Sequence, residues 1–382
     1  MRTHFLSRLL FASLALTSLA QVNTATATHA AVPETNDYRV IGYVMDGETL
    51  PRISAEKMDV INFAFALVHP DNTIYLPGES ATRSLETLTG LRQANPRLKV
   101  LVSVGGWGGD HFSEAALTED SRARFADSAV AMVRAHGLDG VDIDWEYPTL
   151  PGPGITHRPQ DRENFSLMLE TLRARLDALG QEQGGRHYLL TIAAAEGEAA
   201  QGLEIARITQ VLDWINLMTY DFYGSLTSTT GHHASLHRSR SAEADGRAAD
   251  VAVEEFLAAG VPPRKLNVGV AFYGRGFADV QADNHGLNQP FKRDGGFLSW
   301  RQIKADYLGQ PGFVRHWDEQ AQAPWLWNAD SRHFISYDDP QSLRAKAAFV
   351  RDKGLGGVMY WEHRQDADEE LLDVIREGLQ GR

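Results

Sequence analysis

The chain has 382 residues, of which 43% are hydrophobic and 23% charged, a composition typical of a globular protein with one large domain or two ordinary ones. Its net charge of -13 argues against a nucleic-acid partner and against binding to an anionic membrane surface. Because cysteine is absent, burial of a core must stabilise the fold without disulfides.

The N-terminus has the pattern of a secretory signal. Arg2 and Arg8 precede an apolar run that ends at Ala20 and is too short to span a bilayer, and small residues suited to cleavage stand there and at 25–27. We therefore expect residues 1–30 to be a signal peptide and the protein to be secreted, either extracellular or periplasmic. No later segment is apolar for long enough to anchor the chain, so no membrane partner is expected.

Eight short β-branched or apolar runs follow, and most intervals between them show helical spacing of apolar residues, as in 113–134, 162–179 and 247–259. The runs are RVIGYV from Arg39, VINFAFALV from Val60, LKVLVSVGG from Leu98, GLDGVDIDWEYP from Gly137, YLLTIAAA from Tyr188, VLDWINLMTYD from Val211, KLNVGVAFYG from Lys265 and GLGGVMYWE from Gly354. Nearly continuous apolar strands that alternate with helices are typical of a buried parallel sheet. Eight such units predict an α/β fold, a (β/α)8 TIM barrel.

One interval breaks this alternation. Between Gly276 and Pro340 the expected short helix is replaced by a long segment rich in aromatic and turn residues. Loops of that length are usually functional or independently folded. We therefore expect a small α+β insertion domain at 277–337, between strands seven and eight, with the barrel formed by 36–276 and 338–382.

The run GLDGVDIDWEYP places acidic residues in a predicted strand. Alternate side chains of a strand share a face, so Asp142, Asp144 and Glu146 should point the same way. Three carboxylates in a partly desolvated interior raise at least one pKa, which makes a general acid available near neutral pH. Glu146 stands at the C-terminal end of the strand, where barrel enzymes have their active sites. The alternative is a solvent-facing or arginine-paired acidic edge, which three acids on one face make less favourable.

The same run resembles the DxxDxDxE signature of family 18 glycoside hydrolases, the chitinases, through Asp139, Asp142, Asp144 and Glu146. Other segments resemble further motifs of that family, in the same order along the chain: SVGGW from Ser103, MTYD from Met218, TGHHASL from Thr230, FYGR from Phe272 and MYWE from Met359. The resemblance covers essentially the whole chain after the signal. It implies a barrel whose α+β insertion forms one wall of a deep substrate cleft.

The resemblance also implies a mechanism, in which the substrate's own 2-acetamido oxygen attacks the anomeric carbon and the configuration is retained. Glu146 would be the general acid and then the base that activates water. Asp144 would hydrogen-bond the acetamido N–H and partly neutralise the developing positive charge, and Asp142 would share a proton with Asp144. Tyr220 and Asp221 would position the acetamido group.

For substrate binding, the resemblance implies that Trp361 forms the floor under the distorted sugar, although an ordinary core tryptophan is the alternative. The other candidates could instead serve in packing or, for the arginine, in a structural ion pair; they are Tyr43, Phe65, Trp107, Tyr147, Met218 and Arg275. Asp139 lies on the opposite alternation, and we expect it to be structural.

Neither a metal nor an organic cofactor is expected. The histidines of the loop, His232, His233 and His237, have spacing that matches no ligand set with a carboxylate partner, so a polar loop is the favoured interpretation. After Val44 the sequence continues MDGETLP, without the aromatic residues that many family members place there.

The sequence therefore predicts a secreted chitinase that hydrolyses β-1,4 linkages between N-acetylglucosamine units of chitin or chitooligosaccharides, and that acts as a monomer. Two alternatives stay open. One is an endo-β-N-acetylglucosaminidase that acts on glycans or cell walls. The other is a chitin-binding lectin on the same barrel, although such proteins typically lack the acid at the position of Glu146.

Overall fold

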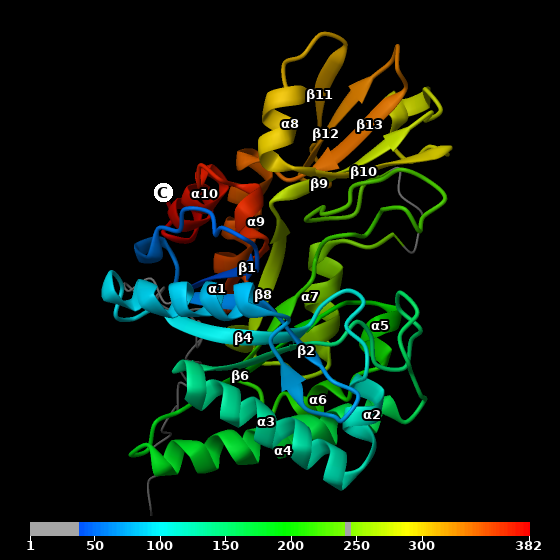
Figure 1. Cartoon of the computed structure of the whole chain (residues 1–382). Coiled ribbons are helices and arrows are strands. Elements are labelled where there is room, and N and C mark those ends of the chain that lie inside the picture. The colour runs from blue at the N-terminus through cyan, green and yellow to red at the C-terminus, as the bar shows by residue number, and fades with distance from the viewer. Residues whose placement is uncertain (1–37, 241–245) are drawn as a thin grey trace, which may run out of the picture. The chain divides into compact units, whose positions relative to one another are not determined.

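Eight parallel strands close into a barrel in residues 38–240 and 246–382, the part of the chain that the computed structural model describes (Figure 1). The strands are β1 (Arg39–Met45), β2 (Val60–Val68), β4 (Lys99–Gly105), β5 (Gly140–Asp144), β6 (Leu189–Ala194), β7 (Trp214–Leu217), β8 (Leu266–Ala271) and β14 (Gly357–Trp361). Each strand pairs with the next in this order, and β1 closes the ring by pairing with β14 as well as β2. The predicted TIM barrel is confirmed, whereas the predicted signal peptide lies outside the described residues.

The barrel strands have two different faces, and β5 shows why the sequence folds this way. Val141 and Ile143 point outward into the core beneath the helices, and Trp145, just beyond the strand, stacks on Phe112 with ring centroids 5.3 Å apart. The alternate position, Asp142, points into the barrel, where it is fully buried. An apolar outward face and a buried inward face that carries carboxylates therefore specify this strand.

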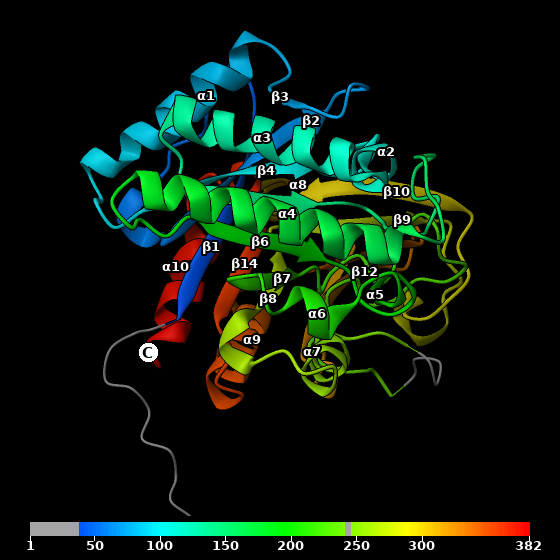
Figure 2. The same cartoon turned by 90° about the horizontal axis from the view of Figure 1, so that it is seen from below.

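Helices cover the outside of the barrel. The longer ones are α1 (Glu79–Gly90), α3 (Glu119–His136), α4 (Asp161–Glu182), α7 (Ala249–Ala258), α9 (Pro340–Asp352) and α10 (Glu370–Leu379), and the short ones are α2 (Phe112–Leu117), α5 (Glu198–Gln201) and α6 (Ile205–Ile208). Figure 2 shows α3 and α4 side by side on one flank. No helix of the described residues is long and apolar enough to cross a membrane.

The helix predicted at 113–134 is in fact two helices, α2 and α3. Thr118 separates them because its backbone is extended, with φ -120° and ψ 162°, and its side chain accepts a hydrogen bond from the backbone N–H of Ser121. This capping arrangement starts a new helix and ends the first one.

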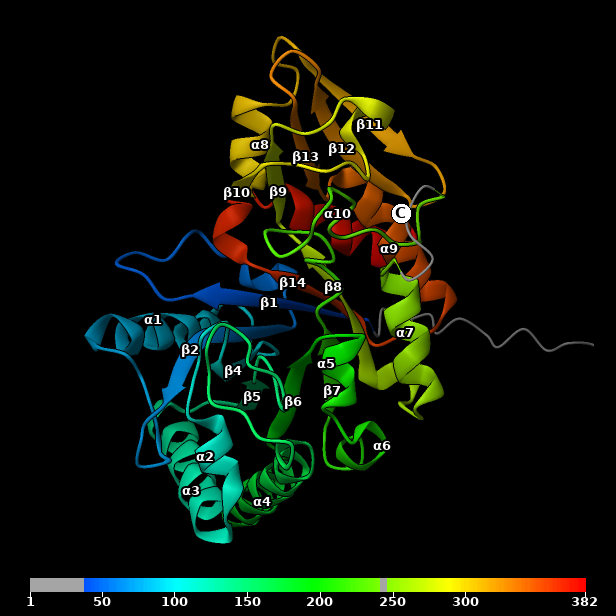
Figure 3. The same ribbon diagram turned by 90° about the vertical axis from the view of Figure 1, so that its right-hand side faces the viewer.

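The insertion between β8 and β14 is a five-stranded antiparallel sheet in the order β10-β9-β13-β12-β11. Its elements are β9 (Tyr273–Ala278), β10 (Arg293–Ser299), α8 (Trp300–Asp306), β11 (Phe313–Asp318), β12 (Ala323–Asn328) and β13 (His333–Tyr337). The sheet begins at Tyr273, before the expected boundary at 277, because β9 pairs with β10 and β13 directly after β8 ends. Figures 1 and 3 show the insertion on the same side of the barrel as α9 and α10.

A buried ion pair ties the end of the insertion to the barrel. The Nζ of Lys346 on α9 lies 2.5 and 2.7 Å from the two carboxylate oxygens of Asp338, and both side chains are almost completely buried. Asp338 also accepts a hydrogen bond from the backbone N–H of Ala271, the last residue of β8, at 3.3 Å. Because a buried charge is costly without its partner, this pair fixes where the insertion rejoins the barrel.

Candidate active site

The acidic run of β5 begins with a carboxylate held inside the barrel. The Oδ2 of Asp142 accepts hydrogen bonds from the hydroxyls of Tyr43 at 2.7 Å and Ser103 at 2.8 Å, and its Oδ1 accepts one from Thr191 at 2.5 Å. These donors come from β1, β4 and β6. Burial raises the pKa of Asp142, while the hydroxyl donors oppose that rise. This residue therefore lies under the site as a fixed support.

Asp144 and Glu146 share the space above Asp142. Burial raises the pKa of Asp144 well above its usual value, and the charges of Glu146 and Asp142 raise it further. Burial also raises the pKa of Glu146 to about 7, while a hydrogen bond with Tyr147 opposes the rise and the charge of Asp221 adds to it. Two such neighbours titrate as a pair, so a proton is available there near neutral pH.

This protonation predicts an alkaline limit to activity. If Glu146 donates a proton in catalysis, kcat/KM should fall as the pH rises through about 7, because the acid form of the pair is then lost. The measurement is kcat/KM on an N-acetylglucosamine oligomer between about pH 4 and pH 10. A profile that stays flat to about pH 9 would contradict this assignment of the acid.

Asp221 differs from Asp144 and Glu146 because its pKa is lowered instead of raised. Arg275 donates to its two oxygens at 2.8 and 2.6 Å, and the Nδ1 of His233 lies 3.6 Å away. Burial alone would raise the pKa of Asp221, but His233 and the Arg275 guanidinium hold it well below its usual range. Asp221 is therefore ionised, and Arg275 forms the ion pair that was the alternative to direct sugar binding.

Replacement of Arg275 should change how kcat/KM depends on pH in the acidic range. In Arg275→Lys the bidentate contact is lost, so the pKa of Asp221 should rise and its ionised form should disappear at a higher pH. We expect kcat/KM to fall about tenfold, with its acidic limb moved to higher pH. The matched control is Arg293→Lys, which alters an exposed ion pair with Asp279 and should change neither quantity.

A cavity of about 700 Å³ opens over the C-terminal ends of the barrel strands. All the predicted site residues except Asp142 line it, namely Tyr43, Phe65, Trp107, Asp144, Glu146, Tyr147, Met218, Tyr220, Asp221, Arg275 and Trp361. The ring of Trp361 stacks on Phe65 at 5.6 Å and lies 5.5 Å from Tyr43, so three strands together build one aromatic surface. Apolar sugar faces bind well to surfaces of this kind.

The structure also adds lining residues that the sequence interpretation missed. They belong mainly to loops and to the insertion, and they are Leu150, Ala193, Glu196, Gly197, Glu198, Ala199, Ser225, Leu226, Thr227, Arg247, Tyr273 and Phe297, with Ala195 and Gly224 between them. No motif marks the loop residues, because only the tertiary fold brings their segments together. Tyr273, in contrast, belongs to the FYGR segment and could have been found there.

Asp139 lies away from this cavity. Its carboxylate pairs with Arg92 at 2.5 Å and Arg186 at 2.7 Å, and it accepts a hydrogen bond from the backbone N–H of Val100 at 2.9 Å. These partners occupy both of its oxygens, which agrees with the structural role expected from its position at the start of the strand.

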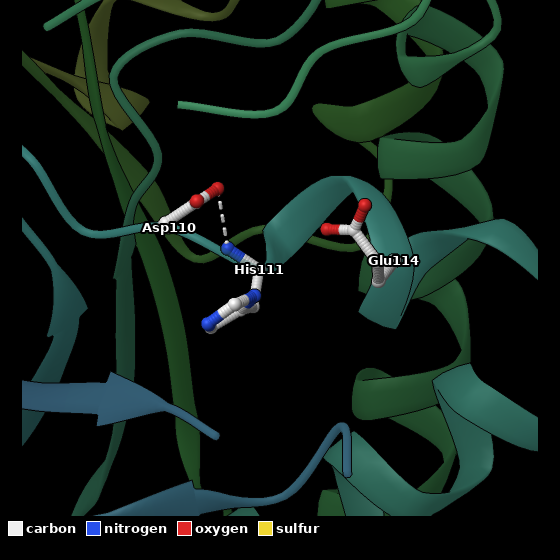
Figure 4. Close-up of side chains that lie close together, drawn as sticks. All are labelled: Asp110, His111 and Glu114. Atoms are coloured by element: carbon white, nitrogen blue, oxygen red, sulfur yellow. Dashed lines mark hydrogen bonds between the residues drawn. The ribbon is translucent and has the colours of Figure 1, made fainter. Parts of the chain in front are cut away.

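The loop histidines each face a different carboxylate. His232 lies 3.3 Å from Asp318, and His237 lies 2.7 Å from Asp250, so these rings do not converge on one ion. Within 38–240 and 246–382, one group has three potential ligands close together: Asp110, His111 and Glu114, at the start of α2 (Figure 4). Asp110 already accepts backbone N–H groups of His111 and Thr156, and Glu114 pairs with Arg158. We assign no metal to it.

Comparisons with known proteins agree with this geometry. Residues 39–366 match the model of glycosyl hydrolases family 18. Chitinase A1 of Niallia circulans is 39% identical over 78% of the chain, and Chitotriosidase-1 of Mus musculus is 34% identical over 72%. The matched segments span only 44% and 60% of these two relatives.

Solved structures show the same fold over nearly the whole chain. A family 18 N-acetylglucosaminidase from Paenibacillus barengoltzii is 42% identical, with a TM-score of 0.84, and the match covers 89% of this chain and 99% of that one. The Group IV chitinase of Ostrinia furnacalis, in complex with allosamidin, is 27% identical, with a TM-score of 0.81, and the match covers 90% of this chain and 99% of that one. The chain therefore belongs to family 18 of the glycosyl hydrolases.

Proposed function

We propose that the protein is a secreted chitinase that hydrolyses β-1,4 linkages between N-acetylglucosamine units, with retention of configuration. The observation that carries the proposal is the buried Oδ1 of Asp144, which has no hydrogen-bond partner among the described residues. A buried carboxylate oxygen without a donor is costly, and a ligand N–H beside it removes that cost. The acetamido N–H of the substrate supplies such a donor.

The first step requires one proton donor and one attacking oxygen. Glu146 gives its proton to the glycosidic oxygen, the bond from that oxygen to the anomeric carbon breaks, and the acetamido carbonyl oxygen bonds to the same carbon. The resulting oxazolinium ion is positive, so Asp144 stabilises it most strongly as its charge develops. In the second step, water attacks the anomeric carbon and the bond from that carbon to the acetamido oxygen breaks, which regenerates the acetamido group. The water gives a proton to the Glu146 carboxylate, which restores the acid and leaves a β-configured product.

Other cavity residues position the reacting sugar. Trp361 supports its apolar face, and the ionised Asp221 lines the cavity with its orientation fixed by Arg275. The hydroxyl of Tyr220 lies 3.8 Å from the sulfur of Met359, a weak partner, so it remains available to donate to the acetamido oxygen. These groups place the acetamido oxygen close to the anomeric carbon, where orientation lowers the barrier.

The test is digestion of N-acetylglucosamine hexamer, followed by mass spectrometry. Shorter N-acetylglucosamine oligomers are expected, and binding without cleavage would contradict the proposal. The second candidate is an N-acetylglucosaminidase, the activity named for the similar Paenibacillus barengoltzii structure, and the endo-β form that acts on glycans is the alternative that the sequence left open. Digestion of a high-mannose glycoprotein separates the endo-β form from a chitinase, because a chitinase should leave it intact.

Secretion and the monomeric state are also part of the proposal. The pattern of residues 1–30 supports export, and N-terminal sequencing of protein collected outside the cytoplasm would test it. Size-exclusion chromatography with light scattering tests the monomer.

A further inference from the structure

The cavity extends unequally to the two sides of Glu146. Its aromatic floor comes from three neighbouring strands, β14, β1 and β2, whereas Glu146 follows β5, which is opposite β14 in the ring. On the half of the ring that carries Glu146, the lining continues through the loops that follow four strands, β4, β5, β6 and β7, at Trp107, Leu150, Glu196, Leu226 and Arg247. The longer part of the cavity therefore lies on the side of the aromatic floor where Glu146 stands.

The chemistry decides which part of a substrate fills that long part, if the proposed function holds. The sugar on the Trp361 floor is attacked by its own acetamido oxygen. The oxygen that Glu146 protonates belongs to the next sugar, towards the reducing end. The long part of the cavity consequently receives the leaving-group sugars.

On the other side of the floor, the connection between β1 and β2 is held away from the cavity. The carboxylate of Asp46 accepts hydrogen bonds from Ser80 at 2.8 Å and Ser84 at 2.7 Å, both on α1. The Arg364 guanidinium donates to the backbone carbonyls of Asp46 and Thr49 at 3.4 and 3.5 Å. No residue from 46 to 64 lines the cavity.

The insertion provides the remaining surface beside the floor. Phe297 on β10 is 42% exposed and stacks on Tyr273 with ring centroids 3.9 Å apart. Tyr273 covers one face of this ring and the Arg275 guanidinium lies over the ring, 4.9 Å from its centroid, so a sugar can contact the part that remains exposed. Together, Trp361 and Phe297 present apolar rings for one or two sugars, and the connection between β1 and β2 adds no lining residue for a further sugar on this side.

We propose that the enzyme cuts N-acetylglucosamine chains near their non-reducing end, releasing one or two sugars at a time, and binds them mainly through the leaving-group sugars. The inference rests on the proposed function. Two features explain the preference for the non-reducing end of the substrate. The connection between β1 and β2 is held away from the cavity, and the lining on the Glu146 side of the floor is long.

The test uses N-acetylglucosamine hexamer with a ¹³C label in its reducing-end sugar, sampled during the first few per cent of conversion. Labelled pentamer or tetramer should form first, with labelled trimer and dimer only later. Early labelled trimer or dimer would overturn the inference while leaving the proposed function intact. An absence of any cleavage would instead overturn the proposed function and, with it, this inference.

Two matched variants test which side of the aromatic floor contributes more to binding of the hexamer. Trp107 follows β4 on the leaving-group side and is 58% exposed, and Met45 ends β1 on the other side and is 39% exposed. Trp107→Ala should raise the KM for the hexamer about tenfold, the effect of losing one stacking contact. Met45→Ala should leave it unchanged. If both variants keep the melting temperature of the wild type and show an equal rise in the KM for the hexamer, the inference is overturned.

Discussion

Glu146→Gln is expected to lower kcat on N-acetylglucosamine hexamer by about 10²-fold to 10⁴-fold, the usual contribution of a positioned general acid. The amide nearly preserves the shape of the side chain but has no proton of suitable acidity to give to the leaving oxygen. Because the cavity and its aromatic floor stay intact, binding of the hexamer should persist. Rates from product chromatography and affinity from calorimetry measure the two effects separately.

The control for this variant is Glu86→Gln, on the exposed face of α1. It makes the same chemical change far from the cavity and should leave both kcat and affinity unaltered. If Glu146→Gln retains most of its activity, another group donates the proton and the proposed mechanism is wrong. If it neither binds nor cleaves, its melting temperature must first be compared with that of the wild type.

Asp144→Asn should show a second large effect, a fall in kcat of about 10²-fold to 10³-fold. The substitution removes the negative charge that stabilises the oxazolinium ion, although its amide still fits the space. Mass spectrometry of hexamer digests measures the fall. Asp306→Asn, an exposed substitution at the end of α8, is the matched control and should keep full activity.

The same variant should be more stable than the wild type at high pH. The pKa of Asp144 is raised in the folded state, so its stabilising contribution is complete at low pH and is lost as the pH rises through that folded pKa. Asparagine does not titrate. At alkaline pH the melting temperature of Asp144→Asn should therefore exceed that of the wild type, by roughly 2–4 °C for each kcal/mol by which ionised Asp144 destabilises the wild-type fold. The difference should shrink towards about pH 4. A difference independent of pH would contradict this assignment.

The barrel could be predicted because its strands are local features of the sequence. Runs such as VINFAFALV are apolar on both faces except at Asn62, and their length and β-branched residues favour a buried parallel strand. The start of the insertion was harder to place, since the apolar run from Lys265 continues without interruption into β9. The chain changes sheets at Phe272, between β8 and β9, and no turn residue marks that change.

The candidate site was predictable to the extent that its residues lie in motifs. The acid run, MTYD and MYWE placed Glu146, Tyr220 and Trp361 at the ends of barrel strands, and the structure brings them to one cavity. The hydroxyl of Thr191 against Asp142 and the ring of Phe297 in the wall could not be foreseen. Both depend on contacts between segments far apart in the sequence, whose positions only the packed fold determines.

The central claim is that the acetamido group of the substrate, with Glu146 as the single acid, performs the displacement. The most direct measurement is proton NMR of a hexamer digest in its first minutes, before the new reducing ends equilibrate. Two successive displacements at the anomeric carbon predict that these ends appear as the β-anomer. Ends that appear as the α-anomer would mean that water attacks the glycosidic bond directly, which would contradict the account.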